Sequence, residues 1–292
     1  MEKALSPGLS AARLLVAAVG TATLAVGCSQ PAADIGRTGN VTEDVRAINR
    51  DPVGFLRELA ARCDRLDRYR LKFHRQERLG LIPTIGAMEE INAAFRSKPF
   101  SVKFEWPDEK MPYYESVYVE GRNDNKLIIR ERHGLLFAPP QVRVVNVDLP
   151  VKIGKAKNPI TVFGLANLAR RTLAPFEDER LRKVMTIKCN GVVDLEPMHR
   201  SAYYLVIERP PTEGYRYTRQ DVFVDVETGL PAGTDLWLED GQLDARYRYS
   251  DVQTNVTLTD ADFHIRRPSP AGDTKDRKAG QATSKESAGS PQ

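Results

Sequence analysis

Cys28 has the most distinctive chemical surroundings of any residue in this 292-residue sequence. It follows an uncharged run of apolar and small residues, LLVAAVGTATLAVG at positions 14–27, and Lys3 and Arg13 precede that run. A basic start, a short apolar core and small residues before a cut site are typical of a secretion signal. The run is shorter than the roughly 20 residues that a helix needs to cross a bilayer. We therefore expect residues 1–27 to be a signal peptide that is removed.

The residues next to this cysteine resemble a known modification signal. Leu24-Ala25-Val26-Gly27-Cys28 resembles the lipobox of bacterial lipoproteins, in which the cysteine sulfur receives a diacylglyceryl group and the new N-terminus is acylated. Each buried methylene contributes about 0.8 kcal/mol, so two or three acyl chains anchor a protein stably. Ser29, in place of Asp, resembles the outer-membrane address of proteobacterial lipoproteins. These residues predict a lipid anchor on Cys28 and a location in the cell envelope, at the outer membrane and facing the periplasm.

The two other cysteines, Cys63 and Cys189, leave two interpretations open. An oxidising envelope permits a disulfide between them. Each lies on the apolar face of its expected element, which fits either a disulfide or two buried thiols. Their spacing is not that of a metal site, because such a site needs at least three close ligands.

The other reactive side chains form no catalytic pattern. Four histidines occur far apart in the sequence: His74, His133, His199 and His264. None belongs to an HExxH motif, and the chain has no GxSxG, P-loop or GxGxxG sequence. The acidic cluster in residues 105–109 has too few oxygen ligands for calcium. We expect no enzyme activity, no metal and no cofactor, and we expect His74 to be exposed on the polar face of a strand.

The charge balance argues against a nucleic-acid partner. The chain has 43 basic and 39 acidic residues, a formal net charge of +4. A nucleic-acid-binding domain usually carries a clear basic excess on one surface. The expected partners are a membrane, through the anchor, and an apolar ligand.

Composition divides the chain after the signal peptide into three parts. Residues 28–50 are expected to be a lipidated N-terminus followed by a flexible tether, because they are largely small and polar. Residues 267–292 have no large apolar side chain and are expected to be a disordered tail. Residues 51–266 are then the folded domain, of a size that buries a substantial core.

Two helices are expected within this domain. Asp51-Pro52 begins the first, with Asp as the cap and Pro in the first turn, and apolar residues then recur at helical spacing up to Leu66. Asn158-Pro159 opens the second, NPITVFGLANLARRTL, which is apolar around most of its circumference and so well buried.

Alternation of apolar and polar residues predicts about nine or ten strands. Tyr69, Leu71 and Phe73 alternate with charged residues, while residues 82–100 are expected to be partly loop. Asn123-Asp124-Asn125 suits the turn of a hairpin because Asn and Asp tolerate positive φ. From Val184 onward the pattern is strands alone. The absence of regular strand-helix alternation argues against a parallel sheet and favours an α+β, mainly β fold: a curved antiparallel sheet or incomplete barrel with helices on its concave side.

Five segments resemble the domain-of-unknown-function 1571 family of bacterial envelope proteins. They are PFSVKFEW (99–106), YVEGRNDNKLIIR (118–130), NPITVFGLANLARR (158–171), VFVDVETGLP (222–231) and LTDADF (258–263). This family looks similar to the lipoprotein localisation factors LolA and LolB, which have an incomplete antiparallel β-barrel closed by helices around a cavity that holds acyl chains. The resemblance implies a LolA-like fold here, without establishing a carrier activity.

Six aromatic residues are expected to line the concave side of the sheet: Phe100, Phe104, Trp106, Trp237, Tyr247 and Tyr249. They are either core residues packed against the helices or the wall of a lipid-binding cavity. Pockets of this kind are mostly apolar, so the sequence does not separate the two. The first hypothesis is a tethered protein that binds an acyl chain or other apolar ligand, in lipid or lipoprotein traffic or in envelope sensing. The alternative is a non-enzymatic interaction protein with a filled core, and a hydrolase is disfavoured for lack of a catalytic constellation.

Overall fold

The computed structural model describes residues 40–132, 141–211 and 216–265. The signal peptide, Cys28, His133 and the tail at 267–292 lie outside the described residues. In chain order the elements are α1 (Val41–Arg50), α2 (Pro52–Asp64), β1 (Arg68–Leu79), β2 (Thr84–Ile85), β3 (Glu89–Arg96), β4 (Ser101–Glu105), β5 (Tyr113–Val119), β6 (Leu127–Glu131), β7 (Val142–Val145), α3 (Leu149–Lys152), α4 (Leu165–Glu177), α5 (Glu179–Arg182), β8 (Thr186–Leu195), β9 (Arg200–Glu208), β10 (Arg219–Asp225), β11 (Pro231–Trp237) and β12 (Leu243–Gln253). Short 3₁₀ helices lie at Asn123–Asn125, Ile160–Val162 and Asp260–Phe263.

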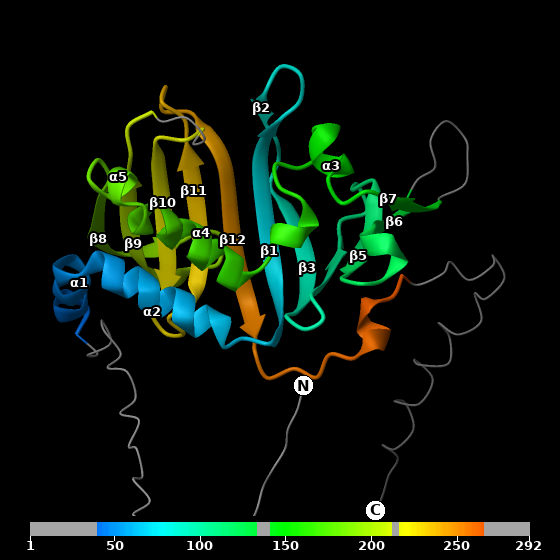
Figure 1. The fold of residues 1–292 in the computed structure, drawn as a ribbon, viewed down its shortest axis with the longest axis horizontal. Helices are drawn as coiled ribbons and strands as arrows, with labels where there is room; N and C mark the ends of the chain where they lie inside the picture. Colours follow the sequence, from blue (N-terminus) through cyan, green and yellow to red (C-terminus); the bar gives the residue numbers. More distant parts are fainter. Residues whose placement is uncertain (1–39, 133–140, 212–215, 266–292) are drawn as a thin grey trace, which may run out of the picture. The chain divides into compact units, whose positions relative to one another are not determined.

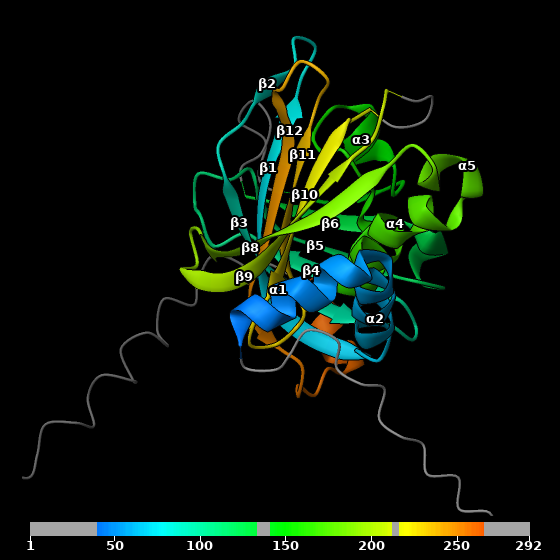
Figure 2. The same ribbon diagram turned by 90° about the vertical axis from the view of Figure 1, so that its left-hand side faces the viewer.

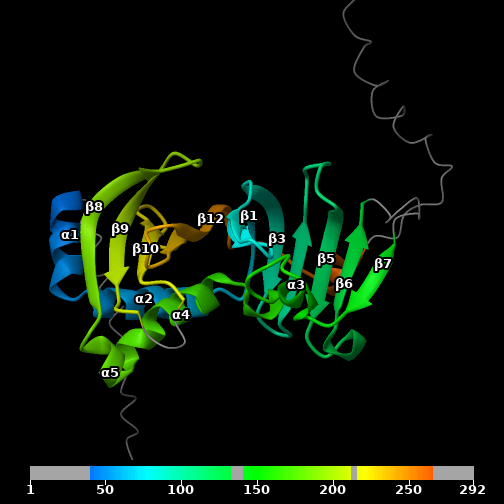
Figure 3. The same ribbon diagram turned by 90° about the horizontal axis from the view of Figure 1, so that it is seen from above.

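The strands form one antiparallel sheet in the order β7-β6-β5-β4-β3-β1-β12-β11-β10-β9-β8, with β2 paired to β1 (Figure 1). Strands β7 and β8 end the path and are not paired with each other, so the sheet is not closed. Figure 3 shows the sheet curving around α2 and α4. The expected class, a mainly β fold with a curved antiparallel sheet and helices on its concave side, is confirmed. None of the helices in the described ranges is long and apolar enough to cross a membrane.

The expectation of a flexible tether through residue 50 is wrong for residues 41–50, which form α1. Asn40 caps this helix by accepting a hydrogen bond from the Thr42 backbone N–H at 3.1 Å. The side chain of Asn49 exchanges two 2.8 Å hydrogen bonds with the backbone of Cys189 on the edge strand β8. Buried Asp44 accepts a 2.6 Å hydrogen bond from the Tyr203 hydroxyl. Helix α1 thus covers a sheet edge and belongs to the domain.

Helix α2 begins where the sequence predicted, because Asp51 accepts a 2.8 Å hydrogen bond from the Gly54 N–H and Pro52 occupies the first turn. Helix α4 begins later than predicted. Residues 160–162 form a 3₁₀ turn, and Gly164 then turns the chain with φ at 126°. The Tyr69 hydroxyl on β1 accepts a 2.9 Å hydrogen bond from the Leu165 N–H, which ties the start of α4 to the sheet.

Strand β3 was expected to be partly loop and is a central strand. Ile91, Ala93 and Phe95 are buried on one face and pair in register with β1. The two alanines and the three charged residues in EEINAAFR weaken the apolar alternation, so the period of two is hard to read. The turn between β5 and β6 is as predicted, with Asn123, Asp124 and Asn125 all near φ +50° to +55°.

The core lies between the concave face and the helices. It is built from the apolar faces of α2 and α4 together with inward residues of nearly every strand from β1 to β12. Burial of this apolar area is the main stabilising contribution. On β12 the predicted inward position of Tyr247 and Tyr249 is correct, since both belong to this core, while Arg248 points to the outer face and pairs with Asp235 at 2.6 Å.

Gly164 is expected to be intolerant of any side chain. A Cβ there would lie 2.9 Å from the Phe95 ring and 3.2 Å from the Tyr69 hydroxyl, in addition to the strained positive φ. Gly241 has a similar constraint at φ +78° but nothing within 4 Å. Gly241→Ala should lower the free energy of unfolding by about 1–2 kcal/mol, the cost of a left-handed residue. Gly164→Ala should cost roughly 1–3 kcal/mol more through overpacking. Urea denaturation measures both, and equal losses would contradict the packing argument.

Candidate ligand-binding cavity

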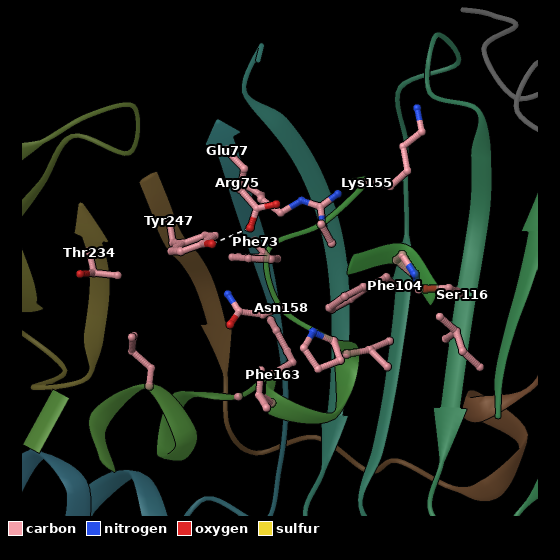
Figure 4. Close-up of a pocket in the computed structure, with 18 of the residues that line it drawn as sticks. Phe73, Arg75, Glu77, Phe104, Ser116, Lys155, Asn158, Phe163, Thr234 and Tyr247 are labelled. Atoms are coloured by element: carbon pink, nitrogen blue, oxygen red, sulfur yellow. Dashed lines mark hydrogen bonds between the residues drawn. The ribbon is translucent and has the colours of Figure 1, made fainter. Parts of the chain in front are cut away.

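A cavity of about 210 Å³ lies between the concave face and the segment that crosses it (Figure 4). Its walls come from β1, β4, β5, β6, β10, β11, β12 and α4, and its cover is the chain from Leu149 to Gly164. Twenty-nine described residues line it, most of them apolar or aromatic. This composition is typical of pockets for apolar ligands, which are mostly hydrophobic with a few placed polar groups.

Stacked aromatic rings form the floor of the cavity. Phe73 lies parallel to Tyr249, with ring centroids 5.4 Å apart, and 5.8 Å from Tyr247. Phe163, on the covering segment, contacts Phe73 at 5.3 Å and meets Phe104 edge-on at 4.8 Å. Offset and edge-to-face pairs at these distances are favourable geometries for aromatic rings. The floor is therefore a rigid apolar surface that spans the middle of the sheet.

Four of the six predicted cavity residues, Phe104, Trp106, Tyr247 and Tyr249, line this cavity. Phe100 does not line it: it is only partly buried and packs against the core beside other aromatic rings, 5.5 Å from Phe95 and 6.0 Å from Tyr118.

Trp237 does not line the cavity either. Thr234 and Leu236 face the cavity, so the strand alternation turns Trp237 to the outer face. There its indole N–H donates a 2.8 Å hydrogen bond to Asp221 and its ring lies beneath Arg219.

The sequence interpretation missed the residues of the cover and two charged residues of the wall. Leu149, Pro150 and Ile153 lie on and next to α3, a single-turn helix too short to show a periodic pattern. Arg75 and Glu77 were overlooked because they are charged. The period of two that runs through Phe73 continues to both residues, so the alternation contained the signal that would have placed them on the inner face.

Glu77 is buried and both of its carboxylate oxygens are hydrogen-bonded. Oε1 accepts a 2.5 Å hydrogen bond from the Tyr247 hydroxyl and Oε2 accepts one of 3.1 Å from the Lys157 backbone N–H. Burial, followed by the charge of Glu77, raises the pKa of Tyr247 well above its ordinary value. Arg75 donates to Glu89 at 2.8 Å. Figure 4 shows Arg75, Glu77 and Tyr247 near one another, with the hydrogen bond between Glu77 and Tyr247 dashed.

A second network of polar side chains lies across the cavity, on and around β10 and β11. Gln220 donates to the hydroxyls of Thr172 and Thr234 at 3.1 and 3.3 Å and accepts from Arg209 at 3.2 Å. Thr234 in turn donates to the Asp221 carbonyl at 2.8 Å. Because a buried polar group is costly only when it lacks a partner, both networks can border an apolar cavity without a large penalty.

The cavity reaches solvent beside α3. Ile153, Lys155 and Arg171 line it and are all exposed, and Arg171 donates a 3.1 Å hydrogen bond to the Asn158 side chain. In Figure 4 Lys155 extends away from the aromatic floor. An entering molecule would therefore pass a rim that carries two cations before it meets the aromatic rings.

The other candidate reactive groups lie outside this cavity. Of the two interpretations left open for Cys63 and Cys189, the structure shows two buried free thiols and not a disulfide. Burial, reinforced by Asp64, raises the pKa of Cys63 to about 12, which keeps it protonated and unreactive. Across the described ranges, no group of three or more His, Cys, Asp or Glu side chains is arranged to hold a metal ion.

His74 does lie on the outer, polar face, but the expectation that it is exposed is wrong. Its Nε2 is 3.1 Å from the Ser250 hydroxyl, and burial lowers its pKa.

Because Tyr247 is buried in the cavity wall, we expect the folded protein to lose stability at alkaline pH. The pKa of Tyr247 is raised in the folded state, so above pH 10 the unfolded chain loses this proton first and the free energy of unfolding falls. The expected slope is at most about 1.4 kcal/mol per pH unit for each such tyrosine. Burial also raises the pKa of Tyr69 and Tyr249, which add to the wild-type slope. Tyr247→Phe should make the slope shallower in urea titrations above pH 10, and an unchanged slope would contradict this assignment.

Comparison with solved structures finds weak likenesses over most of the chain. A chain of the Pseudomonas aeruginosa MucA/MucB complex is 15% identical with a TM-score of 0.38, and the match covers 74% of this chain and 61% of that chain. Lipoprotein LppX of Mycobacterium tuberculosis is 9% identical with a TM-score of 0.37, over 72% and 100% of the two chains. LprF of Mycobacterium bovis is 8% identical with a TM-score of 0.41, over 72% and 96%. Likenesses at this level carry no functional argument.

Comparison of the sequence with curated proteins and with family models gives a clearer result. No curated protein matches the chain. One family model does match, over residues 66–271, which is well over half of the sequence and includes all twelve strands of the sheet. The chain therefore belongs to the family described as protein of unknown function DUF1571.

Proposed function

We propose that this protein is a lipid-anchored protein of the bacterial cell envelope that binds one acyl chain or a similar apolar ligand in its concave cavity. The observation that carries the proposal is the cavity itself, an aromatic-floored space of about 210 Å³ with a rim that reaches solvent. A fully packed interior was the premise of the alternative function, an interaction protein. Because protein cores leave few voids larger than a water molecule, a space of this size needs an explanation.

The size of the cavity favours a slender ligand. Its volume lies below the range of about 300–1,000 Å³ that is typical of pockets for drug-sized molecules. It suits a single hydrocarbon chain better than a lipid with all its chains. Each buried methylene contributes about 0.8 kcal/mol, so about eight methylenes would supply roughly 6 kcal/mol before ordering costs.

The polar groups of the wall support binding rather than catalysis. A hydrolytic site needs a nucleophile or base that is free to meet a substrate. Glu77 instead uses one carboxylate oxygen for Tyr247 and the other for the Lys157 backbone. The pKa of Tyr247 is raised by burial, the opposite of what an activated nucleophile or base would need. We propose a non-enzymatic role, at the outer membrane and facing the periplasm, in lipid or lipoprotein traffic or in envelope sensing.

Filling the cavity should abolish ligand binding. Ala156 is buried and lines the cavity, so Ala156→Phe places a ring where the ligand would lie. The matched control is Ala61→Phe, on the exposed side of α2. Titration of the purified protein with a fluorescent fatty acid should show at least about tenfold weaker binding for Ala156→Phe and wild-type binding for the control. Equal binding by all three proteins, or no binding by the wild type, would refute the proposal.

The anchor is tested separately. Cells grown with a radiolabelled fatty acid should incorporate the label into the wild-type protein, and Cys28→Ala should lose it together with retention in the membrane fraction. The matched variant Cys63→Ala keeps the anchor cysteine and should stay labelled. An unlabelled wild-type protein would remove the anchor from the proposal while leaving the cavity test intact.

A further inference from the structure

The connection between β1 and β3 ends in an exposed apolar tip, residues 80–88. Its sequence, GLIPTIGAM, has no charged residue. Leu81 is fully exposed and Ile82 is 85% exposed, and Ile85 and Met88 are each 37% exposed. Leu81 and Ile82 are the two most exposed large apolar side chains on the described surface. Several such side chains gathered in one place usually mark a site of contact with a membrane or a protein.

The apolar tip is an ordered hairpin. Strand β2 pairs with the end of β1, with Arg78 opposite Ile85 and Leu79 opposite Thr84. The Arg78 guanidinium donates to the Pro83 carbonyl at 3.1 Å, and the Gln76 side chain donates to the Gly86 carbonyl at 2.9 Å. Several hydrogen bonds thus hold Leu81 and Ile82 away from the body of the protein. Because hydrogen bonds hold this hairpin in place, its apolar side chains stay exposed, where they can contact an apolar surface.

This tip adjoins the rim of the cavity. A Cβ on Gly154 would lie 3.9 Å from the backbone nitrogen of Gly80, so the base of the tip touches the segment that follows α3. Ile153 in that segment is 56% exposed and also lines the cavity. Figures 1 and 2 both place β2 and α3 at the same end of the sheet. Lys155 is exposed on the same segment, and Lys152, also exposed, ends α3 and pairs with Asp148 at 2.5 Å.

We propose that the tip, together with Ile153, inserts into the surface of a phospholipid bilayer, so that the cavity opens where acyl chains are found. A narrow projection of aliphatic side chains beside the exposed Lys155 suits an interface with apolar chains below and anionic head groups above. A protein interface of standard size would need a broader surface with aromatic or arginine anchors. This goes beyond the proposed function, because docking requires no ligand in the cavity.

The test uses the full-length protein reconstituted into vesicles of phosphatidylethanolamine and phosphatidylglycerol. An environment-sensitive fluorophore is attached to Ile82→Cys, and labelled wild-type protein supplies the background. The matched control is Asp124→Cys, in another exposed hairpin turn, where the side chain is 89% exposed. Antiparallel topology places the β5–β6 turn at the opposite end of the sheet from the tip. We expect a blue shift and quenching by spin-labelled lipid for the label at 82, and neither for the label at 124.

A companion variant, Leu81→Ser with Ile82→Ser, separates docking from ligand binding. Both positions are exposed, so the urea midpoint should match the wild type. Transfer of a fluorescent fatty acid from vesicles to the protein should slow by at least about tenfold, because two aliphatic side chains no longer enter the interface. Binding of the same fatty acid added from solution should be unchanged. Identical spectra at positions 82 and 124, or a shift at 82 that needs an added envelope protein, would overturn the proposal.

Discussion

The pairing of β1 with β12 is the interaction on which the rest of the structure depends. Strands β3 to β7 extend the sheet from β1, and strands β8 to β11 extend it from β12, so this ladder alone joins the two parts of the sheet. It connects residues about 170 positions apart, for example Phe73 with Tyr249. A contact of such long range has a high cost in chain entropy and must be stabilised by what surrounds it. The aromatic floor and the hydrogen bond from Tyr247 to Glu77 lie across this junction.

The cavity follows from how the concave face is covered. Helices α2 and α4 pack over the strands from β8 to β12, while the remaining strands are covered by the short α3 and the irregular segment to Gly164 (Figure 3). An irregular segment places its side chains less densely than a helix. Space therefore remains above the junction, and the aromatic rings beneath it are too constrained by one another to collapse into it.

The outer face of the sheet accounts for two wrong predictions from the sequence, the exposure of His74 and the inward position of Trp237. It is charged yet largely buried, because long side chains lie across it and pair. Asp235 accepts hydrogen bonds from both Arg246 and Arg248 at 2.6–3.2 Å. Such coverage buries His74 and gives Trp237 an acidic partner, Asp221. A polar outer face in sequence is therefore not the same as an exposed one, since long side chains that pair with one another can cover their neighbours from solvent.

The amino-acid sequence alone was sufficient to predict the features that depend on a few neighbouring residues. The cap at Asp51, the turn at Asn123–Asn125 and the inward position of Tyr247 and Tyr249 follow from side-chain hydrogen bonding, tolerance of positive φ and the period of two. The fold class followed from the same alternation summed over many strands. Tertiary structure decided whatever depends on partners distant in the chain. It made α1 part of the domain through Asn49, ordered β3 between two neighbours and placed Phe100 outside the cavity. It also left Leu81 and Ile82 in solvent, because whether an apolar residue is buried is settled only by what the rest of the chain lays over it.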